Sequence, residues 1–254
     1  MKTVHKVILL AAIGAFAGAI IGYYQFLTMS PELSEGVIKQ LGSIEMLLVV
    51  SGLQTALLTA VAAAVGYKLR KRLIFPETKF PESNGIISAV AIGGASSLII
   101  TLSEKFIFMK YLPEGFNTFS FSPLYLVAAV LYGGVVEEVL LRLGLMTLIL
   151  WLLAKGSRRK HEENGIGSNG QVISVSHAWI AIAISSLLFA LGHLPATAQM
   201  MGLSVPIVIR ALLLNGIAGL GFGWLYWKKG LLYAMLGHMM AHIINQLVLM
   251  PLLL

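Results

Sequence analysis

Two residue types with distinctive chemistry are missing from this chain of 254 residues, which contains no cysteine and no aspartate. The absence of cysteine excludes disulfide bonds, thiolate metal sites and a cysteine nucleophile. Without aspartate, every acidic side chain is a glutamate. Charge is also scarce, because only 11% of the residues are charged, against about 25% in soluble proteins. Hydrophobic residues make up 57% of the chain, and this composition predicts a membrane protein with no soluble domain attached.

Hydrophobic runs long enough to cross a bilayer recur along the chain. A helix needs about 20 residues to cross about 30 Å of hydrocarbon. Candidate spans cover residues 7–27, 43–67, 85–103, 121–154, 178–194, 205–227 and 230–253. The fourth is too long for one upright helix, so it tilts, projects from the bilayer or breaks near Gly133 and Gly134. The predicted fold is all-α, a polytopic transmembrane helix bundle of about seven spans, in a single integral membrane domain over residues 1–254.

Basic residues alternate with these spans. They precede the first span, follow the second and fourth, and separate the sixth from the seventh; they are Lys2, Lys6, Lys68, Arg70, Lys71, Arg72, Lys155, Arg158, Arg159, Lys160, Lys228 and Lys229. Because cytoplasmic loops carry an excess of lysine and arginine, we expect the N-terminus inside and the C-terminus outside. Segment 155–177 is then a cytoplasmic loop. The net charge of +7 follows from this topology, so we expect the lipid bilayer as a partner and no nucleic acid.

Small residues mark two expected helix contacts. Glycines recur every four residues in the first and sixth spans, at Gly14, Gly18 and Gly22 and at Gly219 and Gly223. This spacing lets two helices approach closely. The basic start and an Ala-Phe-Ala motif of the first span also resemble a signal peptide. Its apolar region continues past that motif, so an uncleaved span is the favoured interpretation.

The fourth span carries two adjacent glutamates, Glu137 and Glu138, followed by Arg142. A charge at the centre of a bilayer costs about 2.5–3.5 kcal/mol, so such residues usually serve a function. Glu138 and Arg142 are four residues apart and share a helix face, where they can pair. Glu137 is rotated from Glu138 by about 100° and can point elsewhere. An ion pair that only locks helices together would explain Glu138 and Arg142 but leaves Glu137 without a purpose.

Further polar side chains lie in the fifth and seventh spans. Phe189 and His193 share a face near the end of the fifth. His238, His242 and Asn245 form one helical stripe on the seventh. Such groups need a partner inside the bundle, so we predict that the glutamates and His193 lie within reach of one another, facing a polar cavity. Counting about 1.5 Å per residue along each span, however, places His193 about 10 Å above His238.

These side chains suit hydrolysis of a peptide bond within the membrane. The reaction needs a confined water, a base that activates it and donors for the oxyanion. Glutamate can be the base, and histidine or asparagine N–H groups can be the donors. Two histidines and a carboxylate can alternatively hold zinc. Other intramembrane protease chemistries are excluded, since the chain has no aspartate pair, no GxSG serine loop and no HExxH zinc motif.

The polar motifs resemble those of the CAAX protease and bacteriocin-processing family of membrane endopeptidases. The family pattern is EExxxR, then FxxxH, then a histidine followed four residues later by asparagine or aspartate. Residues 137–142 and 189–193 match the first two motifs in order, spacing and membrane context. The resemblance covers roughly residues 121–250, which we expect to be the catalytic core.

The resemblance implies a role for each matching residue of the first two motifs. Glu137 is expected to be the base that activates water, assisted by His193. Arg142 is expected to orient Glu138. The implied chemistry is of the glutamic type and needs no cofactor, with zinc as the less favoured alternative.

The third motif departs from the family pattern. His238 aligns with the family histidine, but His242 stands four residues later where the family has asparagine. His238 with His242 is expected to stabilise the tetrahedral intermediate. The partner of His238 stays open among His242, Asn245 and Gln246.

The predicted activity is that of an intramembrane endopeptidase acting on a membrane-associated peptide or lipoprotein through glutamate-activated water. One alternative is a non-proteolytic protein on the same scaffold, for lipoprotein N-acylation or transacylation or for bacteriocin self-immunity. A proton-coupled transporter is less favoured, because the two halves show no matching broken helices. The compact chain without an organellar targeting sequence suggests a multi-pass protein of a prokaryotic cell membrane.

Overall fold

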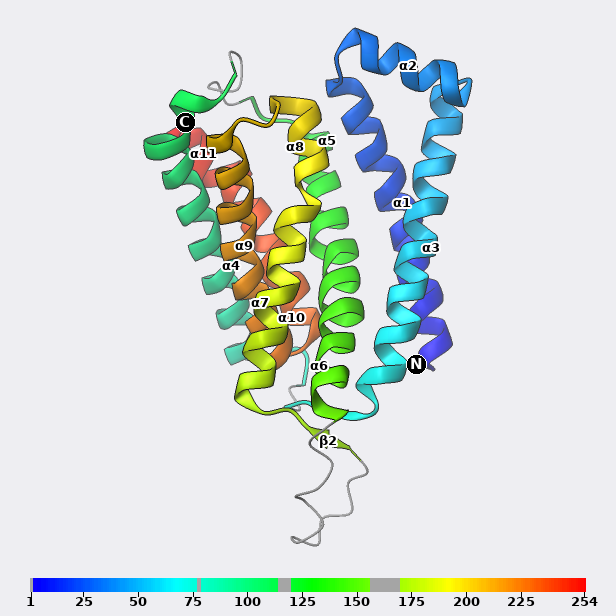
Figure 1. The fold of residues 1–254 in the computed structure, drawn as a ribbon, viewed down its shortest axis with the longest axis vertical. Coiled ribbons are helices and arrows are strands. Elements are labelled where there is room, and N and C mark those ends of the chain that lie inside the picture. The colour runs from blue at the N-terminus through cyan, green and yellow to red at the C-terminus, as the bar shows by residue number, and fades with distance from the viewer. Residues whose placement is uncertain (1, 77–78, 114–119, 156–169) are drawn as a thin grey trace, which may run out of the picture.

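A computed structural model of the chain describes residues 2–76, 79–113, 120–155 and 170–254, and this part is almost entirely helical (Figure 1). Within the described residues, seven helical segments are long and apolar enough to cross a membrane. They are Thr3–Thr28, Ile44–Arg70, Ser83–Tyr111, Pro123–Ala154, Val175–Met201, Val205–Lys228 and Leu231–Leu253. Each overlaps one predicted span, so the all-α bundle of seven spans is confirmed.

The first two spans are single α-helices, and the third has three helical segments. The first is α1 (Thr3–Thr28) and the second is α3 (Ile44–Arg70), joined by the short helix α2 (Pro31–Leu41). The third consists of α4 (Ser83–Ser103), a π-helical turn (Glu104–Phe108) and a 3₁₀ turn (Met109–Tyr111). Ser30 and Ser43 cap α2 and α3 by accepting from the backbone N–H groups of Leu33 and Met46, which explains why these helices begin where they do.

The last three spans follow the 170–174 segment. They are α7 (Val175–Gly192) with α8 (Leu194–Met201), α9 (Val205–Lys228), and α10 (Leu231–Ile244) with a π-helical turn (Asn245–Leu249) and α11 (Met250–Leu253).

Two short strands, β1 (Leu73–Ile74) and β2 (Gln171–Val172), pair in parallel. Most of the predicted loop 155–177 lies outside the described residues. Its described end instead forms β2 and the first turn of α7.

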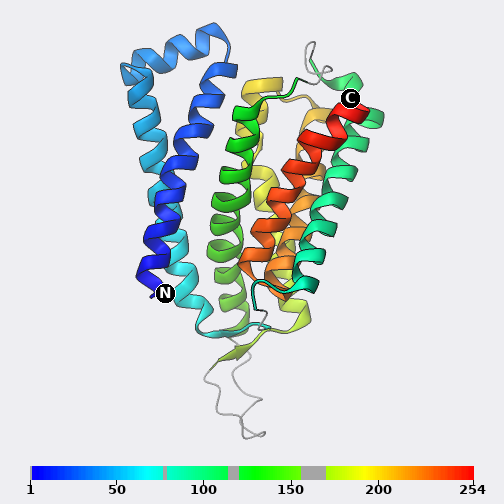
Figure 2. The same cartoon turned by 180° about the vertical axis from the view of Figure 1, so that it is seen from behind.

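The two ends of the chain lie at opposite ends of the bundle (Figure 1). The start of α1, the end of α3 and the start of α7 lie together at one end, whereas α2 and α8 lie at the other (Figures 1 and 2). The predicted basic segments that the structure describes therefore gather at one end, because an even number of spans separates each from the next. The arrangement does not say which end faces the cytoplasm, so the inside position of the N-terminus stays a prediction.

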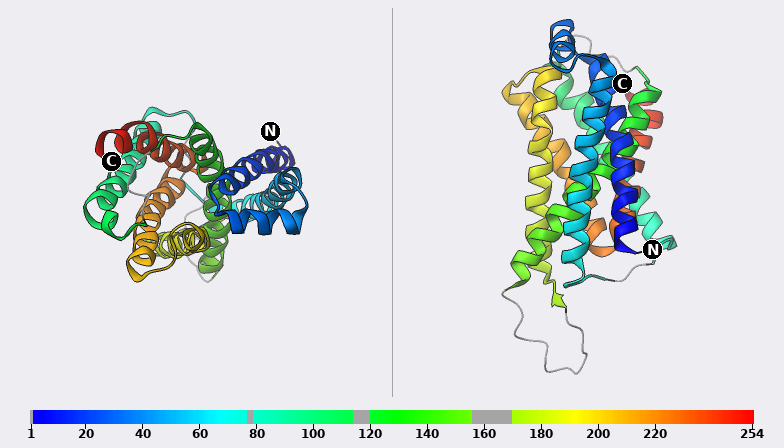
Figure 3. Two further views of the ribbon diagram at one scale, coloured as in Figure 1. Left: turned by 90° about the horizontal axis from the view of Figure 1, so that it is seen from above. Right: turned by 90° about the vertical axis from the view of Figure 1, so that its right-hand side faces the viewer.

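Close glycine contacts join the helices as the sequence predicted. Seen from above, α1 and α3 stand together at one side of the bundle (Figure 3). Gly14, Gly18 and Gly22 of α1 face Thr59, Thr55 and Ser51 of α3. A Cβ atom at Gly14 would lie only 2.7 Å from Thr59 Oγ1. On α9, Cβ atoms at Gly219 and Gly223 would lie 3.0 and 3.1 Å from Ser186 and Ile182 of α7, so both expected contacts are confirmed.

The fourth span runs from Pro123 to Ala154 without a break at Gly133 and Gly134, so that option was wrong. It begins with α5 (Pro123–Ala128), continues through π-helical stretches Ala129–Glu137 and Val139–Met146, and ends with α6 (Thr147–Ala154). Thr147 Oγ1 donates to the carbonyl of Arg142 at 3.1 Å. π-helical turns often mark functional sites, and here they meet at the glutamate pair.

Candidate functional site

Glu138 is fully buried and is paired as the sequence predicted. Arg142 Nε lies 3.3 Å from Glu138 Oε2, and neither side chain is more than 1% exposed. Arg142 Nη1 also donates to Ser185 Oγ of α7 at 3.4 Å. Removing either partner would leave an uncompensated charge in an apolar interior, so this pair has a structural role in joining the fourth and fifth spans.

Glu137 points away from that pair and toward two histidines. Its Oε1 lies 3.8 Å from His193 Nε2, and its Oε2 lies 3.8 Å from His238 Nε2. Its side chain is 17% exposed, whereas that of Glu138 is 1% exposed. Both distances exceed that of a direct hydrogen bond. The structure therefore brings the predicted base within 3.8 Å of both predicted histidines.

His238 contacts both glutamates. Its Nδ1 lies 2.9 Å from Glu138 Oε1, while its Nε2 faces Glu137. The ring is stacked between Phe222 of α9, at a centroid distance of 4.4 Å, and His242, at 5.0 Å. A ring held by a carboxylate at one nitrogen and by flat contacts on both faces has a fixed orientation. Its second nitrogen is thereby directed at Glu137, which has no ion pair with an arginine among the described residues.

The tautomer of His193 follows from its backbone contact. Its Nδ1 lies 2.8 Å from the carbonyl oxygen of Phe189. A carbonyl only accepts, so Nδ1 carries the proton and donates. In the neutral ring, Nε2 is then an acceptor facing Glu137. The Phe189 ring meets the His193 ring edge-on at 4.6 Å and lies 5.6 Å from the guanidinium carbon of Arg142.

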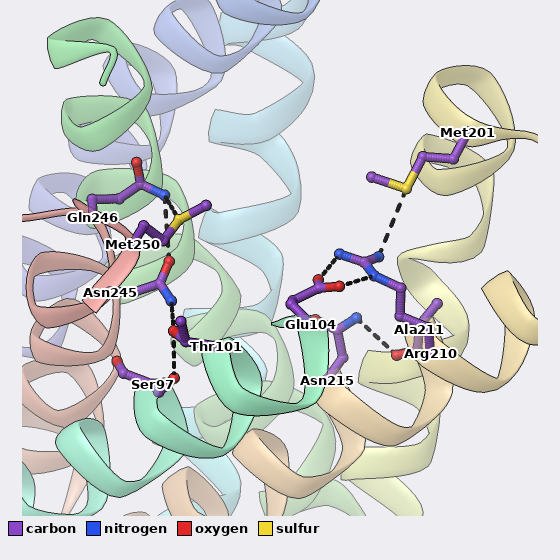
Figure 4. A network of polar contacts seen from close by, with 10 residues as sticks. All are labelled: Ser97, Thr101, Glu104, Met201, Arg210, Ala211, Asn215, Asn245, Gln246 and Met250. Atoms are coloured by element: carbon purple, nitrogen blue, oxygen red, sulfur yellow. Dashed lines mark hydrogen bonds and ion pairs between the residues drawn. The ribbon is translucent and has the colours of Figure 1, made fainter. Parts of the chain in front are cut away.

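The candidates of the third motif separate in space. His242 stacks on His238 within the site. Asn245 Nδ2 donates to Thr101 Oγ1 of α4 at 2.8 Å, and Gln246 Nε2 lies 3.4 Å from Asn245 Oδ1 (Figure 4). The structure thus places His242 beside the predicted catalytic residues and turns Asn245 toward α4. A π-helical turn begins at Asn245, so the stripe expected from α-helical spacing does not continue to this residue.

Three contributors to the site were not singled out as such from the sequence. Ser185 and Phe222 have no sequence signal, because their importance depends on which helix faces them. Gly133 has a sequence signal, since it belongs to a glycine pair beside the glutamates, but that pair predicted only a helix break. A Cβ atom at Gly133 would lie 2.7 Å from His242 Nε2 and 3.3 Å from His238 Nε2. Gly133 therefore makes room for both histidine rings.

Another charged pair of the bundle is separate from this cluster. Arg210 of α9 forms an ion pair with Glu104, and Asn215 Nδ2 donates to the carbonyl of Ala211 at 2.8 Å (Figure 4). The Arg210–Glu104 pair joins α9 to the third span, whereas the contact of Asn215 stays within α9.

The predicted polar cavity and the metal alternative both concern the surroundings of Glu137. A cavity of about 770 Å³ lies toward the basic end of the bundle, and neither Glu137 nor His193 lines it. A polar cavity at the glutamates stays a prediction. In the described part of the chain, no group of three or more histidines and glutamates has an arrangement that would hold a metal ion. A mechanism without a metal stays a prediction.

Seven apolar helices around a buried cluster of glutamates, histidines and arginine define a multi-pass membrane protein with a polar site inside its helix bundle. Comparison with known families identifies the class of this protein. The family model described as "Type II CAAX prenyl endopeptidase Rce1-like" matches residues 118–244, half of the chain, and the chain belongs to that family. Neither a curated protein nor a solved structure gives a significant match.

Proposed function

We propose that this protein is an intramembrane endopeptidase in which Glu137 activates water for attack on a peptide bond. The observation that carries the proposal is the position of Glu137, whose two oxygens each lie 3.8 Å from a histidine Nε2. The neighbouring Glu138 is already engaged by Arg142 and His238. One carboxylate of the pair is thus neutralised, while the other is left to accept a proton.

The gap between Glu137 and His193 suits one water molecule. The two acceptors, 3.8 Å apart, cannot hydrogen-bond to each other, but a water about 2.8 Å from each can donate to both. Such a water has its lone pairs directed away from both groups and toward a substrate carbonyl. Glu137 takes one proton as the oxygen attacks, and later delivers it to the leaving amine as the C–N bond breaks.

His238 is suited to stabilise the oxyanion. Its Nδ1 lies 2.9 Å from Glu138 Oε1, and its Nε2 lies on the side of Glu137. In its imidazolium form the ring donates from both nitrogens. Nε2–H then becomes a donor on the side of Glu137, where the tetrahedral intermediate forms. His242, stacked on the same ring, is the second donor for the intermediate.

The substrates we propose are membrane-associated peptides or lipoproteins, because the cluster lies on helices that span the membrane. Family membership supports proteolysis of the CAAX type. We further propose a prokaryotic cell membrane as the site of action and a mechanism without a resident metal.

Hydrolysis can be separated from the alternatives with oxygen-18 water. The purified protein in liposomes would be incubated with membrane peptides and lipopeptides, with and without a chelator, and the products analysed by mass spectrometry. We expect cleaved peptides carrying one oxygen-18 atom in the new carboxyl terminus, at a rate that the chelator leaves unchanged. Acyl transfer without label would identify a transacylase instead. Loss of cleavage with the chelator, restored by zinc, would contradict the metal-free mechanism.

A further inference from the structure

A cavity of about 770 Å³ lies at the basic end of the bundle, away from the glutamate cluster. It is bounded by the start of α1, the end of α3, the segment after β1 and the start of α10, which meet at this end (Figure 2). One part of its wall is apolar, formed by Leu9, Leu10, Leu143, Leu231 and Leu232. The cavity therefore lies at the ends of membrane-spanning helices, where we expect the head groups of a bilayer.

The polar part of the wall is strongly basic. Lys6, Arg70, Lys79 and Lys229 line the cavity, and the described lining residues include no carboxylate. Like charges repel one another, so the four cations are stabilised when an anion enters. The chemistry of the wall thus matches a ligand with an anionic head and a hydrocarbon tail.

Arg70 gives the strongest indication that a ligand belongs here. Its guanidinium carbon lies over the Phe75 ring, 4.1 Å from the centroid, and 5.3 Å from the centroid of the Tyr226 ring. Contacts with two rings restrain the guanidinium, but a ring face does not replace an oxygen acceptor for all of its N–H groups. Its Nη1 is nevertheless buried without a hydrogen-bond partner among the described residues. A buried donor of this kind is costly, and a phosphate oxygen would satisfy it.

We infer that this cavity binds an anionic phospholipid from the leaflet at the basic end of the bundle. The phosphate contacts Arg70 and the lysines at the mouth, while one acyl chain lies along the leucines. Basic pockets between membrane helices bind anionic head groups in this way. Leu143 lines the cavity and follows Arg142, which holds Glu138. The bound lipid therefore packs against the helix that carries the glutamate pair and stabilises the fold.

Lipid binding can be measured on the intact protein without any assay of activity. The purified chain in neutral detergent would be titrated with phosphatidylglycerol and, in parallel, with phosphatidylcholine of the same acyl chains. Native mass spectrometry counts bound lipids, and thermal unfolding reports stabilisation. We expect one phosphatidylglycerol to bind at least about tenfold more tightly than phosphatidylcholine and to raise Tm, because the choline cation offsets the phosphate charge that the basic side chains attract.

Matched double variants test the position of the site. Lys79→Gln/Lys229→Gln removes two cations from the mouth of the cavity, whereas Lys39→Gln/Lys110→Gln removes two from segments at the opposite end of the spans. We expect the first variant to lose at least about tenfold in phosphatidylglycerol affinity and the second to bind as wild type. Arg70→Gln should lose binding more strongly, and the lysine double variant keeps the test valid if Arg70→Gln does not fold.

Three outcomes would overturn the inference. They are equal binding of the two lipids, wild-type affinity in Lys79→Gln/Lys229→Gln, and equal losses in both double variants. A prenylated peptide with a free carboxylate presents the same chemistry and is the competing occupant. If a farnesylated tetrapeptide displaces phosphatidylglycerol one for one at lower concentration, the cavity belongs to the substrate and not to a membrane lipid.

Discussion

At the scale of single residues, adjacent glutamates acquire different properties from their surroundings. Glu138 is 1% exposed and contacts both Arg142 and His238. Glu137 is 17% exposed and is separated from two histidine nitrogens by 3.8 Å each. The first is held in place by opposite charges, and the second is partly exposed beside two histidine rings. The rotation of about 100° between neighbouring helical residues is what makes this division possible.

Replacement of Glu137 by glutamine should abolish catalysis and leave the fold intact. Glutamine keeps the shape of the side chain but cannot accept a proton from water. We expect peptide hydrolysis to fall at least about 100-fold, the usual contribution of a general base, with an unchanged Tm. Glu35→Gln, on the exposed surface of α2, is the matched control and should keep full activity. Near wild-type turnover in Glu137→Gln would contradict the proposed mechanism.

Removal of the Arg142 side chain should damage the fold as well as activity. Arg142→Ala leaves Glu138 buried and without its opposite charge, at a cost of about 3–5 kcal/mol. We therefore expect a lower yield of folded protein and a lower Tm, measured by size-exclusion chromatography and thermal unfolding. An Arg142→Ala protein of normal stability with altered catalysis alone would instead show that Arg142 contacts the substrate.

His242 and Asn245 should respond differently to alanine. His242 stacks on His238, so His242→Ala should lower turnover by about 100-fold, as loss of an oxyanion donor does. Asn245 donates to Thr101, so Asn245→Ala should lower stability by about 1–3 kcal/mol and leave the turnover of folded protein nearly unchanged. Comparison of kcat with Tm for both variants separates the roles. The reverse pattern would place Asn245 in the third motif.

At the scale of helices, contacts between elements decide the level of each catalytic group. Counting residues along the spans placed His193 about 10 Å above His238, yet both lie 3.8 Å from Glu137. The count assumed that each span begins at the same depth. Helix α7 in fact begins at Val175, three residues before the predicted span, and helix α10 begins at Leu231. The levels of two helices are set by their packing against the fourth span, which no single span reveals.

Gly133 should be intolerant of even the smallest side chain. In Gly133→Ala, the new Cβ would lie 2.7 Å from His242 Nε2, so the ring or the helix must move. A displacement of about 1 Å at a catalytic group can cost about 100-fold in rate, and we expect a loss of that order in peptide hydrolysis. In Gly216→Ala, nothing lies within 4 Å of the new atom. This variant of α9 should therefore be about 1 kcal/mol more stable and keep full activity. Equal activity of the two variants would contradict the close fit.

At the scale of the whole molecule, the seven spans place opposite ends of the chain on opposite sides of the membrane. The absence of cysteine makes this topology directly measurable. A single cysteine in Lys71→Cys, after α3, should react with an impermeant thiol reagent only in permeabilised cells, and one in Lys39→Cys, on α2, should react in intact cells. Both positions are exposed. The opposite labelling pattern would reverse the predicted orientation.

The sequence by itself determined the membrane class, the seven spans and the pairing of Glu138 with Arg142. Hydrophobic length and the spacing of charges along one helix are local properties, so they can be read without a fold. The EExxxR and FxxxH spacings likewise identified Glu137 and His193 before their contact was known. The basic segments predicted that several loops gather at one end, because spans must alternate in direction.

Only the tertiary structure decided how the helices meet. It turned Asn245 toward Thr101, stacked His242 and Phe222 on His238, and made Gly133 the contact point for two rings. It also kept the fourth span continuous through π-helical turns. The physical reason is that the rotation and depth of each helix depend on packing between residues far apart in the chain. A periodic pattern predicts which side chains share a face but not which partner that face receives.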